Sequence, residues 1–181
     1  MTSETVERSG VITFKGNGLT LIGPELKVGD KAPDFQLTST DLGVSTFESL
    51  SDHGTKAVLI IMVPSVDTSV CALETSKFNR QVASIPSEKI KVVTVSADTP
   101  FAMKRWATDE GINNIEMLSD HKDRAFASQF GVYIKELGLL ARAIFLLDKT
   151  GMIRYIQTVA EVATEPDYDA VIKAAREVAA E

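Results

Sequence analysis

Residues 57–63 are apolar without exception, and this run constrains the fold more than any other part of the sequence. Together with Lys56 it predicts a strand that is covered on both faces of a sheet. Over residues 69–85 the apolar positions recur at roughly helical spacing, which predicts a helix that Pro86 ends. The β-branched run at residues 89–96 predicts a second strand. Strand, helix and strand in this order predict a βαβ unit with parallel strands.

Further elements are predicted on both sides of this unit. On the N-terminal side, alternating residues predict a β-hairpin with strands at 10–15 and 19–22 and a turn at 16–18. The other predicted elements are strands at 35–38 and 115–118, helices at 99–111, 123–130 and 168–180, and a strand hairpin formed by 141–147 and 152–159.

A parallel βαβ unit followed by an antiparallel hairpin and a closing helix is the thioredoxin architecture, an α/β fold. No linker interrupts the order of the elements. We therefore expect a single domain over residues 1–181, in which residues 1–23 form an N-terminal extension with the β-hairpin.

Composition and charge argue against several classes of function. With 44% hydrophobic and 24% charged residues, the chain has the composition of a soluble globular protein. A net charge of −6 without a basic run argues against nucleic-acid binding, and every apolar segment is too short to cross a bilayer. The polar, acidic N-terminus shows no secretory signal, and a single cysteine is typical of the reducing cytoplasm, where we expect the protein.

Neither a metal nor a cofactor is expected. His53 and His121 are far apart in the sequence, and no Cys or His accompanies them at metal-ligand spacing.

Cys71, the only cysteine, lies where the predicted strand gives way to the predicted helix. A free cysteine has a pKa of about 8.5, and unpaired N–H groups at a helix N-terminus together with a nearby cation lower it to about 3.5–7.5. Ionisation alone raises the thiolate fraction only about 30-fold at neutral pH. Groups that hold a substrate and stabilise a transition state therefore have to supply the rest of the reactivity.

Three residues suit that task. Thr68, three positions before Cys71, can bring its hydroxyl near the sulfur, where it donates to the thiolate or accepts from a substrate hydroxyl. Pro64 has no N–H and can shield the thiolate from water without competing for hydrogen bonds. Arg142 lies in the otherwise apolar residues 139–147, where a charge needs a partner, and strand pairing can bring it beside Cys71. Each also has a purely structural alternative, as a helix cap, a strand end and an edge residue whose charge reaches water.

The pattern Pro-x-x-x-Thr-x-x-Cys after a buried strand resembles the peroxidatic loop of peroxiredoxins. More narrowly, nearly the whole chain is similar to bacterial thiol peroxidases, a subfamily of atypical two-cysteine peroxiredoxins. The stretches that carry this likeness are residues 67–72, 77–79, 11–23, 28–35, 96–101, 118–120, 140–143 and 165–168.

The resemblance implies a mechanism and partners. The Cys71 thiolate is expected to attack one oxygen of hydrogen peroxide or an organic hydroperoxide, which gives a sulfenic acid and water or an alcohol. Pro64, Thr68 and Arg142 match the family positions that shield the thiolate, hydrogen bond to the substrate, and stabilise the thiolate and transition state. Thioredoxin or another thiol is the implied reductant, and a homodimer with the active site near its interface is the implied assembly.

Two positions depart from the family pattern. Ser69 replaces the usual proline, which we expect to alter only the stiffness of the loop. Ala107 occupies the position of the resolving cysteine, so the intramolecular disulfide of the family cannot form. Two explanations are open: a natural one-cysteine thiol peroxidase, or a variant in which the resolving cysteine was engineered to alanine.

Three functional hypotheses follow from these residues. The first is a thiol-dependent peroxidase in antioxidant defence and redox homeostasis. The second is a redox sensor or partner-binding protein that signals through oxidation of Cys71; the missing resolving thiol favours it because a sulfenic acid would persist longer. The third is an inert homologue with an ordinary thiol. We favour the first because Pro64, Thr68 and Arg142 accompany Cys71.

Overall fold

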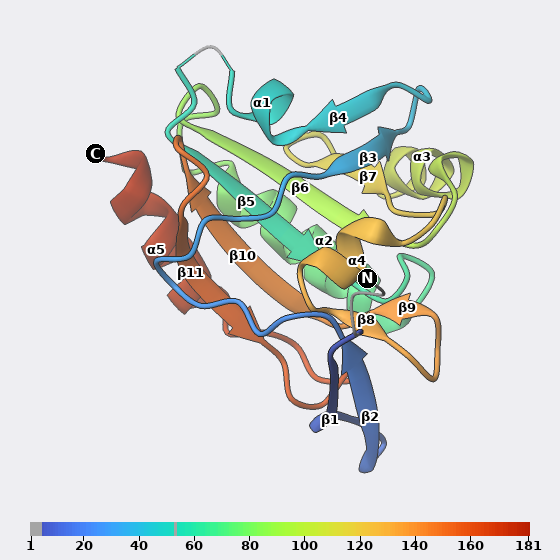
Figure 1. Cartoon of the computed structure of the whole chain (residues 1–181). Helices are drawn as coiled ribbons and strands as arrows, with labels where there is room; N and C mark the ends of the chain where they lie inside the picture. Colours follow the sequence, from blue (N-terminus) through green and yellow to red (C-terminus); the bar gives the residue numbers. More distant parts are fainter. Residues whose placement is uncertain (1–4, 53) are drawn as a thin grey trace.

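The computed structural model describes residues 5–52 and 54–181 and contains a central sheet with helices on both faces (Figure 1). The sheet strands are β3 (Gln36–Ser39), β4 (Val44–Thr46), β5 (Ala57–Met62), β6 (Ile90–Ser96), β7 (Glu116–Ser119), β10 (Ala143–Asp148) and β11 (Ile153–Thr158). Their order is β11-β10-β5-β6-β7-β3-β4. The pairs β5–β6 and β6–β7 are parallel, and the other pairs are antiparallel.

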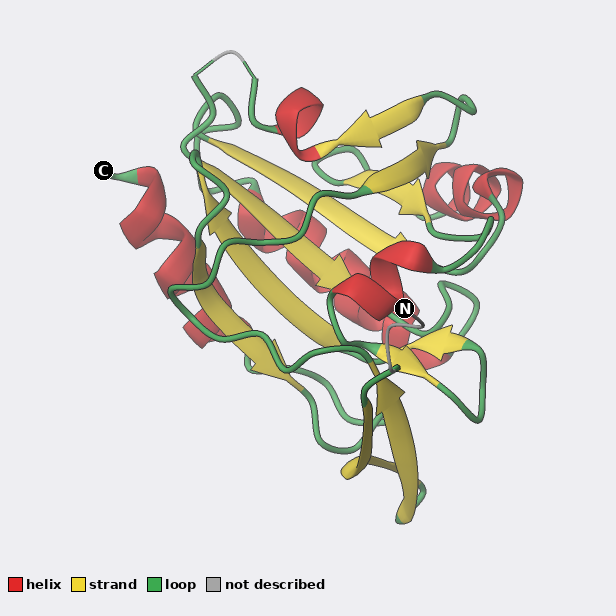
Figure 2. Cartoon of the chain, viewed as in Figure 1, coloured by secondary structure: helices red, strands yellow, loops and turns green. Residues whose placement is uncertain are grey.

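A smaller sheet and five helices complete the described chain (Figure 2). The small sheet has the order β1-β2-β8-β9, with β1 (Glu7–Phe14), β2 (Asn17–Ile22), β8 (Tyr133–Ile134) and β9 (Leu139–Leu140). The helices are α1 (Phe47–Leu50), α2 (Ser69–Val82), α3 (Pro100–Asp109), α4 (Ala125–Gln129) and α5 (Tyr168–Ala179). Within the described residues, none of the helices is long and apolar enough to cross a membrane.

Strand β5 divides the core into two layers. Its side chains alternate between the two faces of the sheet, and every one of them is fully buried. The face of β5 that carries Leu59 packs against side chains of α2, α3 and α5. The face that carries Ile60 packs against α4 and the β1–β2 hairpin. The predicted strand covered on both faces is therefore confirmed.

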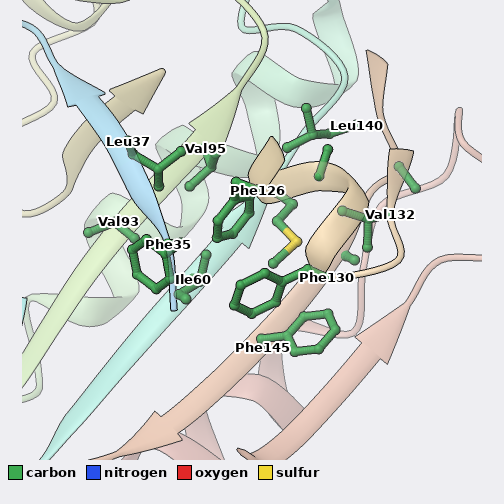
Figure 3. Close-up of a cluster of buried hydrophobic side chains, with 14 of the residues drawn as sticks. Phe35, Leu37, Ile60, Val93, Val95, Phe126, Phe130, Val132, Leu140 and Phe145 are labelled. Carbon is green, nitrogen blue, oxygen red and sulfur yellow. The ribbon is translucent and has the colours of Figure 1, made fainter. Parts of the chain in front are cut away.

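Aromatic packing consolidates the second of these layers. Phe126 and Phe130 of α4 stack at 4.3 Å between ring centroids, and Phe35 meets Phe126 edge-on at 5.3 Å. Phe145 of β10 meets Phe130 in the same edge-on way at 5.3 Å (Figure 3). The short helix α4 is thus anchored to the sheet by its two phenylalanine rings.

The predicted thioredoxin architecture with an N-terminal hairpin is confirmed. The predicted βαβ unit is β5-α2-β6, and the predicted C-terminal hairpin and helix are β10, β11 and α5. Residues 1–4 of the predicted extension and His53 lie outside the described residues. That residues 1–181 form one domain stays a prediction.

Two predicted boundaries in the N-terminal hairpin and α4 were wrong. The hairpin turns at Lys15 and Gly16, both with positive φ (50° and 79°), rather than at residues 16–18, so β2 already starts at Asn17. A two-residue hairpin turn of the favoured type needs positive φ at both positions, which Gly16 adopts without strain. Helix α4 begins only at Ala125, because Arg124 before it is left-handed (φ 55°).

The predicted strand at 141–147 is also shorter than expected. Strand β10 starts at Ala143, and the preceding residues connect it to β9. There the Ala141 N–H donates to the Val132 carbonyl, beside the small sheet, and the Arg142 carbonyl accepts from the Val159 N–H. Arg142 is therefore held at the point where the chain leaves the small sheet and enters the large one.

Candidate active site

Cys71 lies in the first turn of α2, beyond the carboxyl end of β5, and its side chain is fully buried. Thr68 is the N-cap of this helix: its Oγ1 accepts from the Cys71 N–H at 3.2 Å and donates to the Ser65 carbonyl at 3.3 Å. Ser69 is the first helical residue. Thr68 thus places the backbone of Cys71, and Thr68 itself is an exposed residue.

Strand pairing brings Arg142 to the sulfur. Ala143 pairs with Met62 across β10 and β5, so the residue before Ala143 lies at the end of β5 where α2 begins. Arg142 Nη2 donates to Cys71 Sγ at 3.2 Å, and Arg142 Nε donates to the Val162 carbonyl at 3.0 Å. Arg142 is only 1% exposed, so it is not an edge residue whose charge reaches water.

Pro64 is buried two residues after the end of β5. The preceding residue, Val63, still follows the sheet through a hydrogen bond from its N–H to the Val95 carbonyl. Pro64 therefore begins the loop that leads to Cys71, at a place where its missing N–H leaves no unpaired donor.

The sequence analysis missed Glu74. This glutamate lies one turn after Cys71 on the same face of α2 and is fully buried. Its Oε2 accepts from Arg142 Nη1, whereas Oε1 has no hydrogen-bond partner among the described residues. The sequence feature that could have indicated Glu74 is its i+3 spacing from Cys71, which puts its carboxylate on the buried face of the helix.

Arg142 therefore faces two groups that can become anions. Burial raises the pKa of Glu74 to about 7, against the opposing pull of the Arg142 charge. Burial lowers the pKa of Arg142, but the charges of Glu74 and Cys71 outweigh it and raise that pKa above its ordinary value. One guanidinium therefore donates to both the Glu74 carboxylate and the Cys71 sulfur.

Glu165, with its partners Lys77 and Tyr168, lies on the solvent side of the buried Arg142–Glu74 pair. Glu165 accepts from Lys77 Nζ at 2.6 Å and from the Tyr168 hydroxyl at 2.7 Å. Its hydrogen bonds from Lys77 and Tyr168 lower the pKa of Glu165. This negative charge adds to the burial that keeps the pKa of Glu74 high.

Asp98, also missed, holds the loop between Pro64 and Thr68 in place. Its Oδ1 accepts from Ser65 Oγ at 2.8 Å, and its Oδ2 accepts from the Val66 N–H at 2.8 Å and from Ser96 Oγ at 2.6 Å. Asp98 follows β6 and precedes α3, so it ties the loop before Cys71 to the neighbouring strand end.

Ala107 lies on α3, whose predicted start is confirmed by the Thr99 cap and by Pro100 in its first turn. Ala107 is partly buried against the same hydrophobic cluster that contains Cys71. Within the described ranges, no group of three or more His, Cys, Asp or Glu side chains is arranged to hold a metal ion.

Comparisons with known proteins agree with this geometry. The model of the AhpC/TSA family matches residues 28–156. The chain belongs to the AhpC/TSA family. The thiol peroxidase of Bacillus subtilis (strain 168) is 46% identical over 165 residues, 91% of this chain and 96% of that protein. The thiol peroxidase of Streptococcus pneumoniae (strain ATCC BAA-255 / R6) is 43% identical over 166 residues, 92% of this chain and 99% of that protein.

Solved structures extend the likeness to the fold. A peroxiredoxin-like protein from Aquifex aeolicus is 39% identical with a TM-score of 0.84, over 97% of this chain and 99% of that one. A thiol peroxidase from Chromobacterium violaceum is 27% identical with a TM-score of 0.81, over 92% of this chain and 95% of that one. The resemblance to thiol peroxidases and the predicted class, a peroxiredoxin-type peroxidase, are confirmed.

Glu74→Gln is expected to change how stability depends on pH. The raised pKa means that the folded protein holds the Glu74 proton more tightly than the unfolded chain, so ionisation costs stability as pH rises from about 4.5 to about 7. Between about pH 5 and about pH 8, the wild type should lose about 2 kcal/mol of unfolding free energy relative to Glu74→Gln, as measured by urea denaturation. Glu110→Gln, at an exposed position after α3, controls for loss of a surface carboxylate. An identical pH dependence in wild type and Glu74→Gln would contradict the prediction.

Asp98→Asn is expected to loosen the loop before Cys71. The amide nitrogen of asparagine cannot accept a hydrogen bond, so the bond from Val66 N–H or the one from Ser65 is lost. Amide exchange of Val66 should become about 10-fold faster. Asp41→Asn is a matched control, because Asp41 accepts from Ser39 Oγ and, at 3.0 Å, from the Gly43 N–H in an exposed turn. Unchanged exchange of Val66 in Asp98→Asn would show that the loop does not depend on this carboxylate.

Proposed function

We propose that this enzyme reduces hydrogen peroxide and organic hydroperoxides with Cys71 as the attacking nucleophile. The hydrogen bond from Arg142 Nη2 to Cys71 Sγ, at 3.2 Å, carries this proposal. A guanidinium that donates to sulfur stabilises the thiolate over the thiol, and the thiolate is the nucleophilic form.

In the proposed oxidation step, the Cys71 thiolate attacks one peroxide oxygen. The S–O bond forms as the O–O bond breaks, and the leaving oxygen takes up a proton and departs as water or an alcohol. Cys71 is oxidised to a sulfenic acid and the peroxide is reduced. Arg142 stabilises the charge that spreads over sulfur and oxygen, the Thr68 hydroxyl holds the peroxide, and Pro64 keeps water from the sulfur.

Reduction needs a thiol from outside the chain, because Ala107 stands at the proposed resolving position. The thiol of thioredoxin or of a small molecule attacks the sulfenic sulfur and displaces water, and a second thiol then releases Cys71 from the mixed disulfide. Since Cys71 is fully buried, the loop before it has to open for this step. Ala107 fits either a natural one-cysteine enzyme or an engineered variant.

The remaining proposals concern setting and assembly. A role in antioxidant defence in the cytoplasm follows from the chemistry and from the need for thiol reductants. A homodimer is supported by exposed apolar side chains on the two helices beside the site, Leu73 (43% exposed) and Phe101 (68% exposed). A redox sensor is the second candidate function, favoured by Ala107, because a sulfenic acid without an internal thiol persists longer.

Single-turnover kinetics test the proposed oxidation step. In stopped flow with one equivalent of hydrogen peroxide, Cys71 should react at least about 100-fold faster than a free thiol, because the site stabilises the transition state. Thr68→Ser keeps the hydroxyl and should retain the rate, whereas Thr68→Val should lower it about 10-fold to 100-fold.

Thr99→Val is the matched control for these variants. Thr99 caps α3 as Thr68 caps α2, accepting from the Ala102 N–H at 3.3 Å, so this variant removes a helix cap without removing a hydroxyl from the site. A wild-type rate equal to that of a free thiol would refute the peroxidase function. Equal losses in Thr68→Val and Thr99→Val would refute the role of Thr68.

Ala107→Cys tests the proposed resolving position. After one equivalent of peroxide, this variant should form an internal disulfide with Cys71, gain thioredoxin-dependent turnover and resist further oxidation to the sulfinic acid. Mass spectrometry after alkylation measures the disulfide. Ala102→Cys places a thiol elsewhere on α3 and should form little of it. Equal disulfide yields in the two variants, or none in Ala107→Cys, would show that the position was misassigned.

A further inference from the structure

The segment of residues 159–163, which follows β11, contacts Arg142 at two points. The Val159 N–H donates to the Arg142 carbonyl at 3.0 Å, and the Val162 carbonyl accepts from Arg142 Nε at 3.0 Å. A guanidinium is planar, so the partner of Nε sets the direction in which the other two nitrogens point. The place of the Val162 carbonyl therefore governs how Arg142 Nη2 meets Cys71 Sγ.

The N-terminal hairpin holds this segment from its other side. The Thr13 N–H donates to the Ala160 carbonyl at 2.7 Å, and the Thr13 carbonyl accepts from the Val162 N–H at 2.9 Å. Thr13 and Glu161 form a parallel bridge. Figure 1 shows the hairpin (blue) beside the orange-red loop that follows β11. Strand β1 thus fixes the N–H of Val162, the same residue whose carbonyl accepts from Arg142.

The Glu161 side chain adds further hydrogen bonds between the N-terminal hairpin and the segment of residues 159–163. One of its oxygens accepts from Thr13 Oγ1 at 2.7 Å and from the Gly16 N–H at 3.3 Å, and the other accepts from the Lys15 N–H at 3.0 Å. The second oxygen also accepts from the Ala163 N–H in its own segment, at 3.3 Å. A single carboxylate therefore ties the end of β1 and the hairpin turn to the loop that holds Arg142.

We propose that the N-terminal hairpin positions Arg142 for its reaction, with Glu161 as the positioning residue that couples the two. Glu161 acts through Thr13 and the Val162 carbonyl and does not itself touch the reacting atoms. The inference rests on the proposed roles of Cys71 and Arg142. It assigns to the extension a part in reactivity, beyond covering one face of the sheet.

The charge state of Glu161 allows a clean readout. Its hydrogen bonds from Thr13 and from the hairpin backbone lower the pKa of Glu161 to about 2, so it stays ionised through any practical assay range. The charged groups around Cys71 are Arg142 and Glu74, with Glu165 and Lys77 beyond them, and Glu161 variants leave all of these residues unsubstituted. A change in the pH profile of Cys71 then reports the placement of Arg142.

Glu136 provides a matched control at the opposite strand of the hairpin. Its two carboxylate oxygens accept from the Thr20 N–H at 3.1 and 2.9 Å, and this backbone hydrogen bond lowers the pKa of Glu136. Glu136 lies between β8 and β9, so it anchors β2 to the small sheet and makes no connection to the Val162 carbonyl. Glu136→Ala thus removes a carboxylate that binds β2, while the bonds of Thr13 and of the hairpin turn to residues 160–162 remain.

The test compares Glu161→Ala, Glu161→Gln and Glu136→Ala with the wild type in two assays. In Glu161→Ala, the pH midpoint of Cys71 alkylation by iodoacetamide should rise by at least about half a unit, and the single-turnover rate with hydrogen peroxide should fall about 10-fold. Glu161→Gln keeps an acceptor oxygen and should recover part of both effects. Glu136→Ala should leave both readouts at wild-type values.

The outcomes separate the two proposals. Equal effects of Glu161→Ala and Glu136→Ala, or none from Glu161→Ala, overturn the positioning role. A wild-type rate no faster than a free thiol refutes the peroxidase function, while the alkylation midpoints still decide whether Glu161 positions Arg142. Should Glu161→Ala fail to fold, Thr13→Val removes one donor to Glu161 and keeps the backbone bonds; it should shift the midpoint in the same direction, and an unshifted midpoint overturns the proposal.

Discussion

Arg142 brings a permanent positive charge into the interior, and the arrangement of the site follows from the need to compensate it. A buried charge costs several kcal/mol unless its partners replace the lost water. Each nitrogen of this guanidinium has such a partner: Nη2 the Cys71 sulfur, Nη1 the Glu74 carboxylate and Nε the Val162 carbonyl. Because the donors of a guanidinium have a rigid geometry, three partners from distant parts of the chain have to converge on one plane. The Cys71 thiol is one of these three partners.

Ordinary backbone pairing produces this convergence. The register of β10 on β5 puts Arg142 beside the end of β5, and the helix that follows β5 carries Cys71 and Glu74 one turn apart. The third partner comes from the loop after β11, the strand that pairs with the other side of β10. The site therefore needs no unusual backbone at Cys71, because the sheet aligns its components.

Those parts of the fold and site that depend on local sequence patterns could be predicted from the sequence. The buried strand, the Thr68 cap position and the start of α3 at Thr99-Pro100 depend on nearest neighbours, so they could be predicted. Strands of two residues, such as β8 and β9, are too short for an alternating pattern to show, and the start of β10 depends on a tertiary hydrogen bond at Ala141. Glu74 and Asp98 were missed because a carboxylate usually indicates a solvated surface, whereas in the fold Glu74 is fully buried and Asp98 is partly buried.

The contribution of Val162 could not be read from the sequence at all. Its function in the site belongs to a backbone carbonyl, which every residue possesses, and depends on where the hairpin places it. Residue types carry information about side-chain chemistry, whereas the position of a carbonyl is a property of the whole fold. A valine at this position therefore looks like one more core residue.

The proposed oxidation and reduction steps place opposite demands on this site. The proposed attack on a peroxide uses an enclosed sulfur, whereas the proposed reduction by an external thiol requires an exposed one, and Cys71 is fully buried. The bonds that enclose Cys71 on the loop side are those of Asp98 to the loop and of the Thr68 cap. Arg142 is held independently, by Val159 and Val162. In the proposed reduction step, opening of the loop would therefore leave the bonds of Arg142 to Val159 and Val162 in place.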